Sequence, residues 1–141
     1  MTPEQIKLVQ QSFAKVEPIA GQAADLFYDR LFENAPGVRP LFPNDMSSQK
    51  LKLMQMLSTA VANLHQVEEI LPAVAELGRR HVGYGARPAH YDSVGDALLW
   101  TLEQGLGDGF TPAVREAWTA TYGTLASAMK AAAAELAGPE H

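Results

Sequence analysis

Apolar residues recur every three or four positions along most of this chain, and that spacing is the period of a buried helix face. The pattern is clearest in two stripes, Ile6, Val9, Phe13 and Val16 and then Val114, Trp118, Tyr122, Leu125 and Met129. No segment alternates apolar and polar residues for long enough to form a strand. The chain has 141 residues, the length of one domain, so we expect a single all-α domain.

Capping residues mark two of the expected helix starts. Thr2, Pro3 and Gln5 have the spacing of a capping box with proline in the first turn. Ser47 or Ser48 is expected to cap a long helix that ends near residue 66.

Prolines and glycines set the other boundaries. They divide the chain into six major helices and a short one after Pro36, with no linker or repeat. One further helix is expected over residues 19–34, another is expected to end near residue 83, and a third is expected over 89–106. The last helix is expected to begin at residue 112 and to end in a frayed tail at 136–141. The irregular corners favour an orthogonal wrap of helices over an up-down bundle.

Charge and composition exclude several functions. The formal net charge of -5 argues against nucleic-acid binding, which needs a basic surface. The chain has no cysteine, which excludes disulfides, thiolate metal sites and covalent haem attachment. Its first residues lack the basic segment and apolar run of a signal peptide, and no apolar stretch is long enough for a membrane span. We expect a soluble, cytoplasmic protein.

One helical stripe ends in a histidine. Leu71, Val74, Leu77 and Gly78 share a face, and His81 follows Leu77 by four residues, so its imidazole projects from that same face. A buried imidazole either bonds a fixed partner, as an ordinary core histidine does, or ligates a metal.

Tyr28 and Gln49 are two further polar residues on apolar faces. Each has a structural explanation, because a buried tyrosine commonly donates to a carbonyl and a glutamine in a first turn commonly serves a cap. Together with His81 and with Phe42 at a proline-rich corner, they match a constellation of residues known from one protein family.

In this constellation and its surroundings the chain resembles the globin family, especially bacterial single-domain globins, the haem domain of flavohaemoglobins, and neuroglobin. The matching stretches are FYDRLF at 27–32, LF at 41–42, LGRRH at 77–81, YDSVG at 91–95, FTPAVR at 110–115, AW at 117–118 and YG at 122–123. Their order and spacing cover nearly the whole chain. The resemblance implies a globin fold, a three-on-three helical sandwich, in one domain over residues 1–141.

The resemblance also implies a cofactor, haem b, and roles around it. His81 matches the proximal ligand that binds iron through Nε2, and its other ring nitrogen is expected to donate to a carbonyl one turn back, near Leu77. Phe42 matches the phenylalanine that packs on the porphyrin. Tyr28 and Gln49 match the distal pair that faces a bound gas.

Further positions complete the expected haem contacts. Leu53, one turn beyond Gln49, matches an apolar wall on the distal side. Lys52 and Arg80 are candidates for pairing with the haem propionates, since two carboxylates at a pocket rim need cationic partners. The other expected contacts are Tyr84, Tyr91 and Val94.

Two differences within the family refine these expectations. Neuroglobin places an iron-ligating histidine where this chain has Gln49, so the ferrous iron here is expected to be five-coordinate. Flavohaemoglobins pair the proximal histidine with a tyrosine, matched by Tyr91, and a glutamate. That glutamate position falls at Ala133, and Glu135 turns to another helix face, which argues against a strong electronic push on the iron.

The resemblance thus predicts a globin that reversibly binds dioxygen, nitric oxide and carbon monoxide, with nitric oxide dioxygenase-type reactivity supported by an external reductase. Oxygen storage or delivery without turnover is an alternative, and a haem redox protein or gas sensor is another. A haem-free helical adaptor, in which His81 is only structural, is a further alternative of a different kind. We expect a monomer or a weak homodimer.

Overall fold

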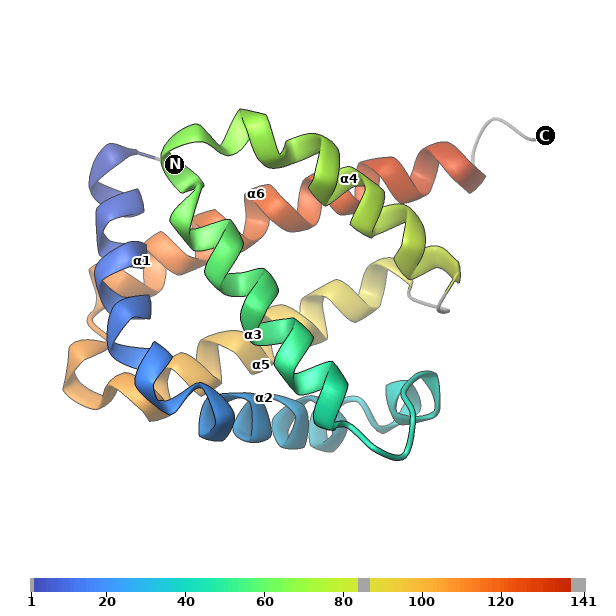
Figure 1. Cartoon of the computed structure of the whole chain (residues 1–141), viewed down its shortest axis with the longest axis horizontal. Helices are drawn as coiled ribbons and strands as arrows, with labels where there is room; N and C mark the ends of the chain where they lie inside the picture. Colours follow the sequence, from blue (N-terminus) through green and yellow to red (C-terminus); the bar gives the residue numbers. More distant parts are fainter. Residues whose placement is uncertain (1, 84–86, 138–141) are drawn as a thin grey trace.

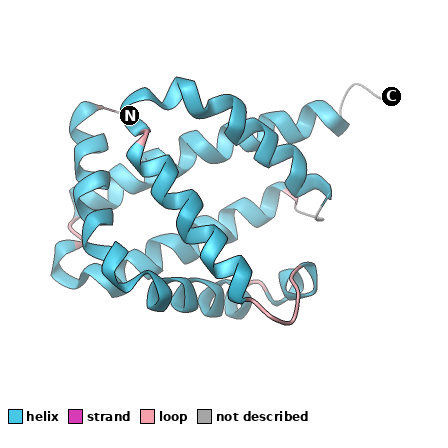
Figure 2. Cartoon of the chain, viewed as in Figure 1, coloured by secondary structure: helices cyan, strands magenta, loops and turns pink. Residues whose placement is uncertain are grey.

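The computed structural model describes residues 2–83 and 87–137, and in these ranges it is helical without a strand (Figure 2). The six α-helices described are α1 (Pro3–Val16), α2 (Ala20–Asn34), α3 (Ser47–Ala62), α4 (Val67–Gly83), α5 (Pro88–Leu106) and α6 (Pro112–Ala137). Short 3₁₀ turns join them: η1 (Glu17–Ile19), η2 (Pro36–Leu41), η3 (Leu64–Gln66) and η4 (Gly107–Gly109). The expected six major helices and the short one after Pro36 are confirmed.

The helix starts test the two capping predictions. The capping box at Thr2 is confirmed, because the Gln5 backbone N–H donates to the Thr2 hydroxyl at 3.1 Å and the Thr2 N–H donates to the Gln5 side chain at 3.0 Å. The prediction that Ser47 or Ser48 caps α3 was wrong, because Met46 is the N-cap residue and no side chain caps the helix there. Asp45 accepts from the Ser47 N–H at 3.0 Å, and its backbone and side-chain hydrogen bonds with Ser47 lower the pKa of its carboxyl. A carboxylate suits this place because the exposed N–H groups of a helix start favour negative charge.

Two helix ends also differ from expectation. α3 ends at Ala62 rather than near residue 66. The Asn63 side-chain amide donates to the Thr59 carbonyl at 2.7 Å, and the chain then turns into η3. α6 continues to Ala137, so the first two residues of the expected tail at 136–141 are helical. Its run of alanines, the strongest helix formers, explains the extension. The rest of that tail lies outside the described residues.

The helices form the expected three-on-three sandwich. α1, α3 and α4 make one layer, and α2, α5 and α6 make the other (Figure 1). The most extensive packing joins α4 to α6, α2 to α5 and α1 to α6, whereas α3 packs mainly on α2 and α1. Among the described helices none is long and apolar enough to cross a membrane.

Trp118 fixes α6 against α1 at the centre of the core. Its side chain is 2% exposed, and its indole N–H donates to the Ser12 hydroxyl at 2.8 Å. Ser12 in turn donates to the Leu8 carbonyl at 2.7 Å, so both buried polar groups are satisfied. This contact holds together two segments 106 positions apart in the sequence.

Gly78 fixes α4 against α6. A Cβ atom at Gly78 would lie 2.5 Å from the Met129 carbonyl oxygen and 2.7 Å from the Met129 Cα. Only a glycine permits this approach of the two backbones. Because Gly78 precedes His81 by three residues, the close crossing sets the position of the histidine.

Candidate functional site

His81 lies half-buried near the end of α4, with its Nδ1 atom 2.7 Å from the Leu77 carbonyl oxygen. A carbonyl can only accept, so Nδ1 carries the proton in this contact, and Nε2 is the ring nitrogen suited to bind a metal. The predicted hydrogen bond to the carbonyl one turn back is therefore confirmed. It orients the imidazole as the outer hydrogen bond of a ligating histidine does.

Tyr28 and Gln49 meet between α2 and α3. The Gln49 side-chain amide donates to the Tyr28 hydroxyl at 3.3 Å, and Tyr28 is only 3% exposed. Burial raises the pKa of Tyr28, and the hydrogen bond from Gln49 opposes that shift more weakly. The phenol therefore stays protonated at neutral pH, and because its oxygen accepts from Gln49, its proton remains available for a ligand.

Phe42 joins Tyr28 in an aromatic cluster. The Phe42 ring lies edge-on to Tyr28 at 5.6 Å between centroids and edge-on to Phe32 at 5.4 Å. Edge-to-face contacts of this kind favour fixed ring positions. The structure thus brings together two residues, Tyr28 and Phe42, that the sequence singled out separately.

Arg39 holds the corner that carries Phe42, a role that was not predicted from the sequence. Its guanidinium donates to the carbonyls of Phe42 at 3.3 Å, Pro43 at 3.0 Å and Asn44 at 3.4 Å. It also lies 5.1 Å above the Phe32 ring. The available signal was an arginine in a proline-rich corner, where backbone carbonyls lack helical partners.

Tyr91, Leu53 and Val94 occupy the inner side of the fold. Leu53 on α3 and Val94 on α5 are half-buried and pack against the core. Tyr91 is 9% exposed, and its hydroxyl is buried with no hydrogen-bond partner among the described residues. An unpaired buried hydroxyl costs about 1–3 kcal/mol, so Tyr91 is suited to a bound group that brings an acceptor.

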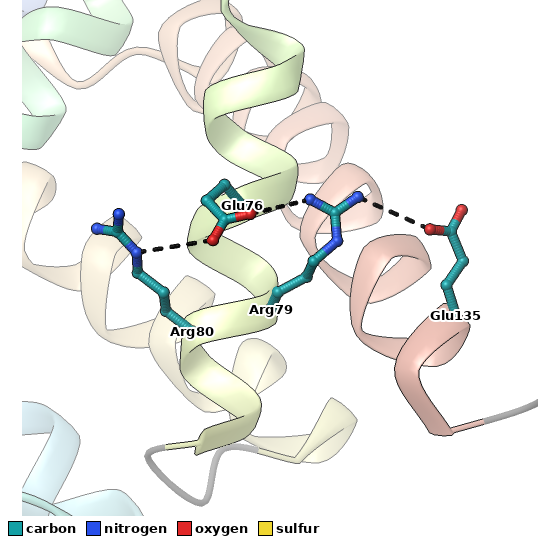
Figure 3. Close-up of polar contacts among 4 residues, drawn as sticks. All are labelled: Glu76, Arg79, Arg80 and Glu135. Atoms are coloured by element: carbon teal, nitrogen blue, oxygen red, sulfur yellow. Dashed lines mark hydrogen bonds and ion pairs between the residues drawn. The ribbon is translucent and has the colours of Figure 1, made fainter. Parts of the chain in front are cut away.

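Arg79, Arg80 and Glu135 belong to a chain of ion pairs on the outside of α4 and α6 (Figure 3). Glu76 lies 4.0 Å from Arg80 and 3.2 Å from Arg79, and Arg79 lies 3.8 Å from Glu135. Glu135 is thus turned to Arg79 at the surface. Lys52 is exposed on α3, and Tyr84 lies outside the described residues.

The site holds one oriented imidazole rather than a set of protein ligands. No group of three or more His, Asp or Glu side chains in residues 2–83 and 87–137 is arranged to hold a metal ion. A metal bound by His81 alone needs further ligands from a prosthetic group, and a porphyrin supplies four nitrogens. The unpaired Tyr91 hydroxyl and the aromatic cluster at Phe42 also fit such a group. One oriented imidazole is the protein ligand that a haem of this class requires.

The comparisons with known proteins give the family. The sequence model of the globin family matches residues 25–129. A flavohemoprotein of Bacillus subtilis is 35% identical over 105 residues, and one of Vibrio cholerae is 29% identical over 131 residues. The chain belongs to the globin family. Haem binding and the binding of small gases are the properties that this membership carries.

The same comparisons set the extent of the likeness. They cover 72% and 89% of this chain but 26% and 33% of the two flavohemoproteins, so the chain spans about a quarter to a third of their length. A solved bacterial globin from Campylobacter jejuni superposes with a TM-score of 0.84 over 96% of this chain and 99% of that one, at 24% identity. That likeness establishes the globin fold.

Proposed function

We propose that this chain is a haem b globin that reversibly binds dioxygen and other diatomic gases, including nitric oxide and carbon monoxide. The observation that carries the proposal is the Gln49–Tyr28 hydrogen bond of 3.3 Å, which gathers two hydrogen-bond donors in one largely buried place. On α4, the contact of 2.7 Å between the His81 Nδ1 atom and the Leu77 carbonyl would orient the imidazole for a metal.

The described residues that would hold the haem lie on α3, α4 and α5 and at the corner that follows η2. His81 would bind the iron, Phe42 would pack on the ring, and Tyr91, whose buried hydroxyl has no partner among the described residues, would contact the group. The remaining proposed contacts are Leu53, Val94, Tyr84, Lys52 and Arg80. When bound, the haem would supply an iron centre that can take a diatomic gas.

Tyr28 and Gln49 would stabilise a polar ligand without ligating the metal. A phenol and an amide donate hydrogen bonds but are weak iron ligands, so neither would compete with a gas for the metal. Each hydrogen bond is worth about 1–3 kcal/mol to a partly negative ligand, and about 1.4 kcal/mol slows release tenfold. The pair therefore favours high oxygen affinity and slow oxygen release.

Nitric oxide dioxygenase-type reactivity is the proposed chemistry for this pocket. Tyr28 and Gln49 would hold dioxygen where nitric oxide can reach it, and the product is nitrate. Repeated turnover consumes electrons, for which we propose an external reductase as partner. Oxygen storage or delivery uses the same residues without turnover.

Absorption spectra test the haem site. Wild-type protein reconstituted with haem b should give a Soret band and a five-coordinate ferrous spectrum. His81→Gly should lose the proximal ligand and regain it when imidazole is added. His65→Gly, on an exposed residue of η3, is the matched control and should behave as wild type. A normally coordinated haem in His81→Gly without imidazole, or a six-coordinate wild-type ferrous form, contradicts the proposal.

Rapid-mixing experiments distinguish nitric oxide dioxygenase turnover from oxygen storage or delivery. The oxygenated protein is mixed with nitric oxide, nitrate is measured, and re-reduction is followed in cell extract. Stoichiometric nitrate with fast re-reduction supports dioxygenase turnover. Stoichiometric nitrate with sluggish re-reduction supports storage or delivery, and an absence of nitrate contradicts the reactivity.

A further inference from the structure

An ion pair joins α3 to α2 beside the distal residues. The Lys50 ammonium lies 2.8 Å from an Asp25 carboxylate oxygen. Lys50 directly follows Gln49 on α3. On α2, Asp25 precedes Tyr28 by three residues, so the two side chains lie on neighbouring positions of one helix surface. The ion pair and the Gln49–Tyr28 hydrogen bond therefore connect the same two helical turns.

The hydrogen bond between Gln49 and Tyr28 leaves little room for movement of α3. Hydrogen bonds from an N–H group to an oxygen are usually about 2.7–3.2 Å long. The one from the Gln49 amide to the Tyr28 hydroxyl is 3.3 Å long. A small further displacement of α3 away from α2 would therefore break it, so the spacing of the two helices decides whether the distal pair forms.

The start of α3 has few other attachments. Its N-cap residue makes no side-chain capping hydrogen bond, and a surface hollow of about 530 Å³ lies between the helix, α1 and η1. Toward the far end of α3, Ser58 donates to Glu17 at 3.3 Å and the Gln10 side chain donates to the Val61 carbonyl at 3.0 Å. The ion pair of Lys50 is thus the charged contact that holds the first turn of α3 on α2.

This ion pair is suited to set a position more than to stabilise the fold. The Lys50 side chain is 32% exposed and the Asp25 side chain is 60% exposed. Exposed ion pairs add little to the free energy of unfolding, because water weakens the attraction and two long side chains lose freedom. Their separation is nevertheless well defined at 2.8 Å, the length of a charge-assisted hydrogen bond. Loss of the pair should therefore move α3 without unfolding the chain.

We propose that Lys50 and Asp25 are positioning residues for the distal pair. Their ion pair holds the first turn of α3 at the distance from α2 at which the Gln49 amide reaches the Tyr28 hydroxyl. It thereby sets how strongly the pocket favours dioxygen, which accepts hydrogen bonds when bound, over carbon monoxide, which accepts them poorly. This selectivity rests on the proposed function, whereas the positioning concerns only contacts within the chain.

Nuclear magnetic resonance tests the positioning apart from gas binding. In the wild-type chain, with and without haem, a nuclear Overhauser effect should join the Gln49 side-chain amide to the Tyr28 ring. Asp25→Lys and Lys50→Asp each bring two like charges together, so each should weaken this signal. The double variant Asp25→Lys/Lys50→Asp forms an ion pair of reversed polarity and should restore it.

Oxygen release tests the consequence for the pocket. Asp25→Lys and Lys50→Asp should each accelerate oxygen dissociation about threefold, which is part of the effect of one lost hydrogen bond. The double variant should return to the wild-type rate. Carbon monoxide dissociation and the urea midpoint of unfolding should change little in all three variants. Lys50→Met removes the charge without adding repulsion, which keeps the test decisive if a reversed charge impairs folding.

Glu33→Lys is the matched control, because it makes the same kind of charge change as Asp25→Lys on the same helix. Glu33 is 71% exposed and pairs with Arg30 within α2, at 3.8 Å. This variant should keep the wild-type Overhauser effect and the wild-type oxygen rate.

The outcomes separate this inference from the proposed function. A wild-type Overhauser effect in both single variants overturns the positioning role, and so does a double variant that fails to restore the signal. A chain that takes no haem contradicts the proposed function, but the contact between Gln49 and Tyr28 in the haem-free chain still decides whether Lys50 and Asp25 position the pair.

Discussion

Among single residues, Tyr28 has the clearest chemical assignment, because burial keeps its phenol protonated while its oxygen accepts from Gln49. Tyr28→Phe removes the proton donor and keeps the ring that packs on Phe27 and Phe42. We expect oxygen dissociation to accelerate about tenfold, the equivalent of one hydrogen bond of about 1.4 kcal/mol. Stopped-flow displacement of oxygen by carbon monoxide measures this rate.

Carbon monoxide is the built-in control for that variant. It carries much less negative charge than dioxygen when bound, so its dissociation rate should change little in Tyr28→Phe. An unchanged oxygen rate removes Tyr28 from the proposed role. Equal acceleration of both gases indicates a change of pocket shape instead of a lost hydrogen bond.

Two kinds of feature could be predicted from the sequence: contacts between residues of one helix, and polar residues that interrupt an apolar helix face. The His81–Leu77 contact follows from helix geometry alone, because i and i+4 residues are neighbours. Arg39 and Asp45 were missed because their partners are loop carbonyls and an N–H group whose positions depend on the path of the corner. That path is set by packing, which the local pattern does not encode.

Among the helices, α4 has the strictest packing requirement, because it approaches α6 backbone to backbone at Gly78. In Gly78→Ala the new Cβ meets the Met129 carbonyl at 2.5 Å, so α4 must move. We expect a loss of about 1–3 kcal/mol in the free energy of unfolding, as for other overpacked cores. Because α4 carries His81, the variant should also release haem faster, which transfer to a haem-scavenging protein measures.

Gly123→Ala is the matched control on α6. A Cβ there meets nothing within 4 Å, so the substitution should stabilise the helix by about 0.5–1 kcal/mol and leave haem release unchanged. A Gly78→Ala variant as stable as wild type contradicts the requirement for close approach.

The existence of each helix was predictable, whereas some ends were not. Periodic apolar faces and Gly or Pro boundaries identify α5 and α6 directly, since Pro88 and Pro112 begin them. The end of α3 at Ala62 depends on an asparagine that caps a carbonyl of its own helix, and the apolar pattern runs through it. The crossing at Gly78 was equally hidden, because a glycine on a helix face indicates close approach without naming the partner.

Over the whole molecule, the site is assembled from helices that the fold brings together from distant parts of the sequence. Tyr28 on α2 and Gln49 on α3 are 21 positions apart, and Trp118 and Ser12, which join the two ends of the chain, are 106 apart. Periodicity identified the polar residues on these faces, but only the resemblance to globins grouped them into one site. Neither predicted the small internal cavity that Leu53 helps to line, because packing gaps depend on all the surrounding side chains at once.

The buried tyrosines also make the stability of the whole molecule sensitive to high pH. Burial raises the pKa of Tyr28 and of Tyr91 above the usual value of 10.0. The pKa of Tyr122 is raised mainly by burial and further by the nearby Tyr91, Asp92 and Asp96 side chains. As pH rises past about 10, phenols in the unfolded chain lose their protons while the folded chain keeps its own. The unfolded state then binds fewer protons, so the free energy of unfolding falls with increasing pH.

This stability is fully present below about pH 10 and is lost as pH rises toward the folded pKa values. Urea unfolding, followed by circular dichroism from neutral to strongly alkaline pH, measures the decline. Tyr28→Phe removes one of the three groups, so its decline should be shallower than that of wild type, whatever the lysines contribute to both. Parallel curves for the two proteins contradict a raised pKa at Tyr28, and with it the argument that its phenol is a buried, protonated donor.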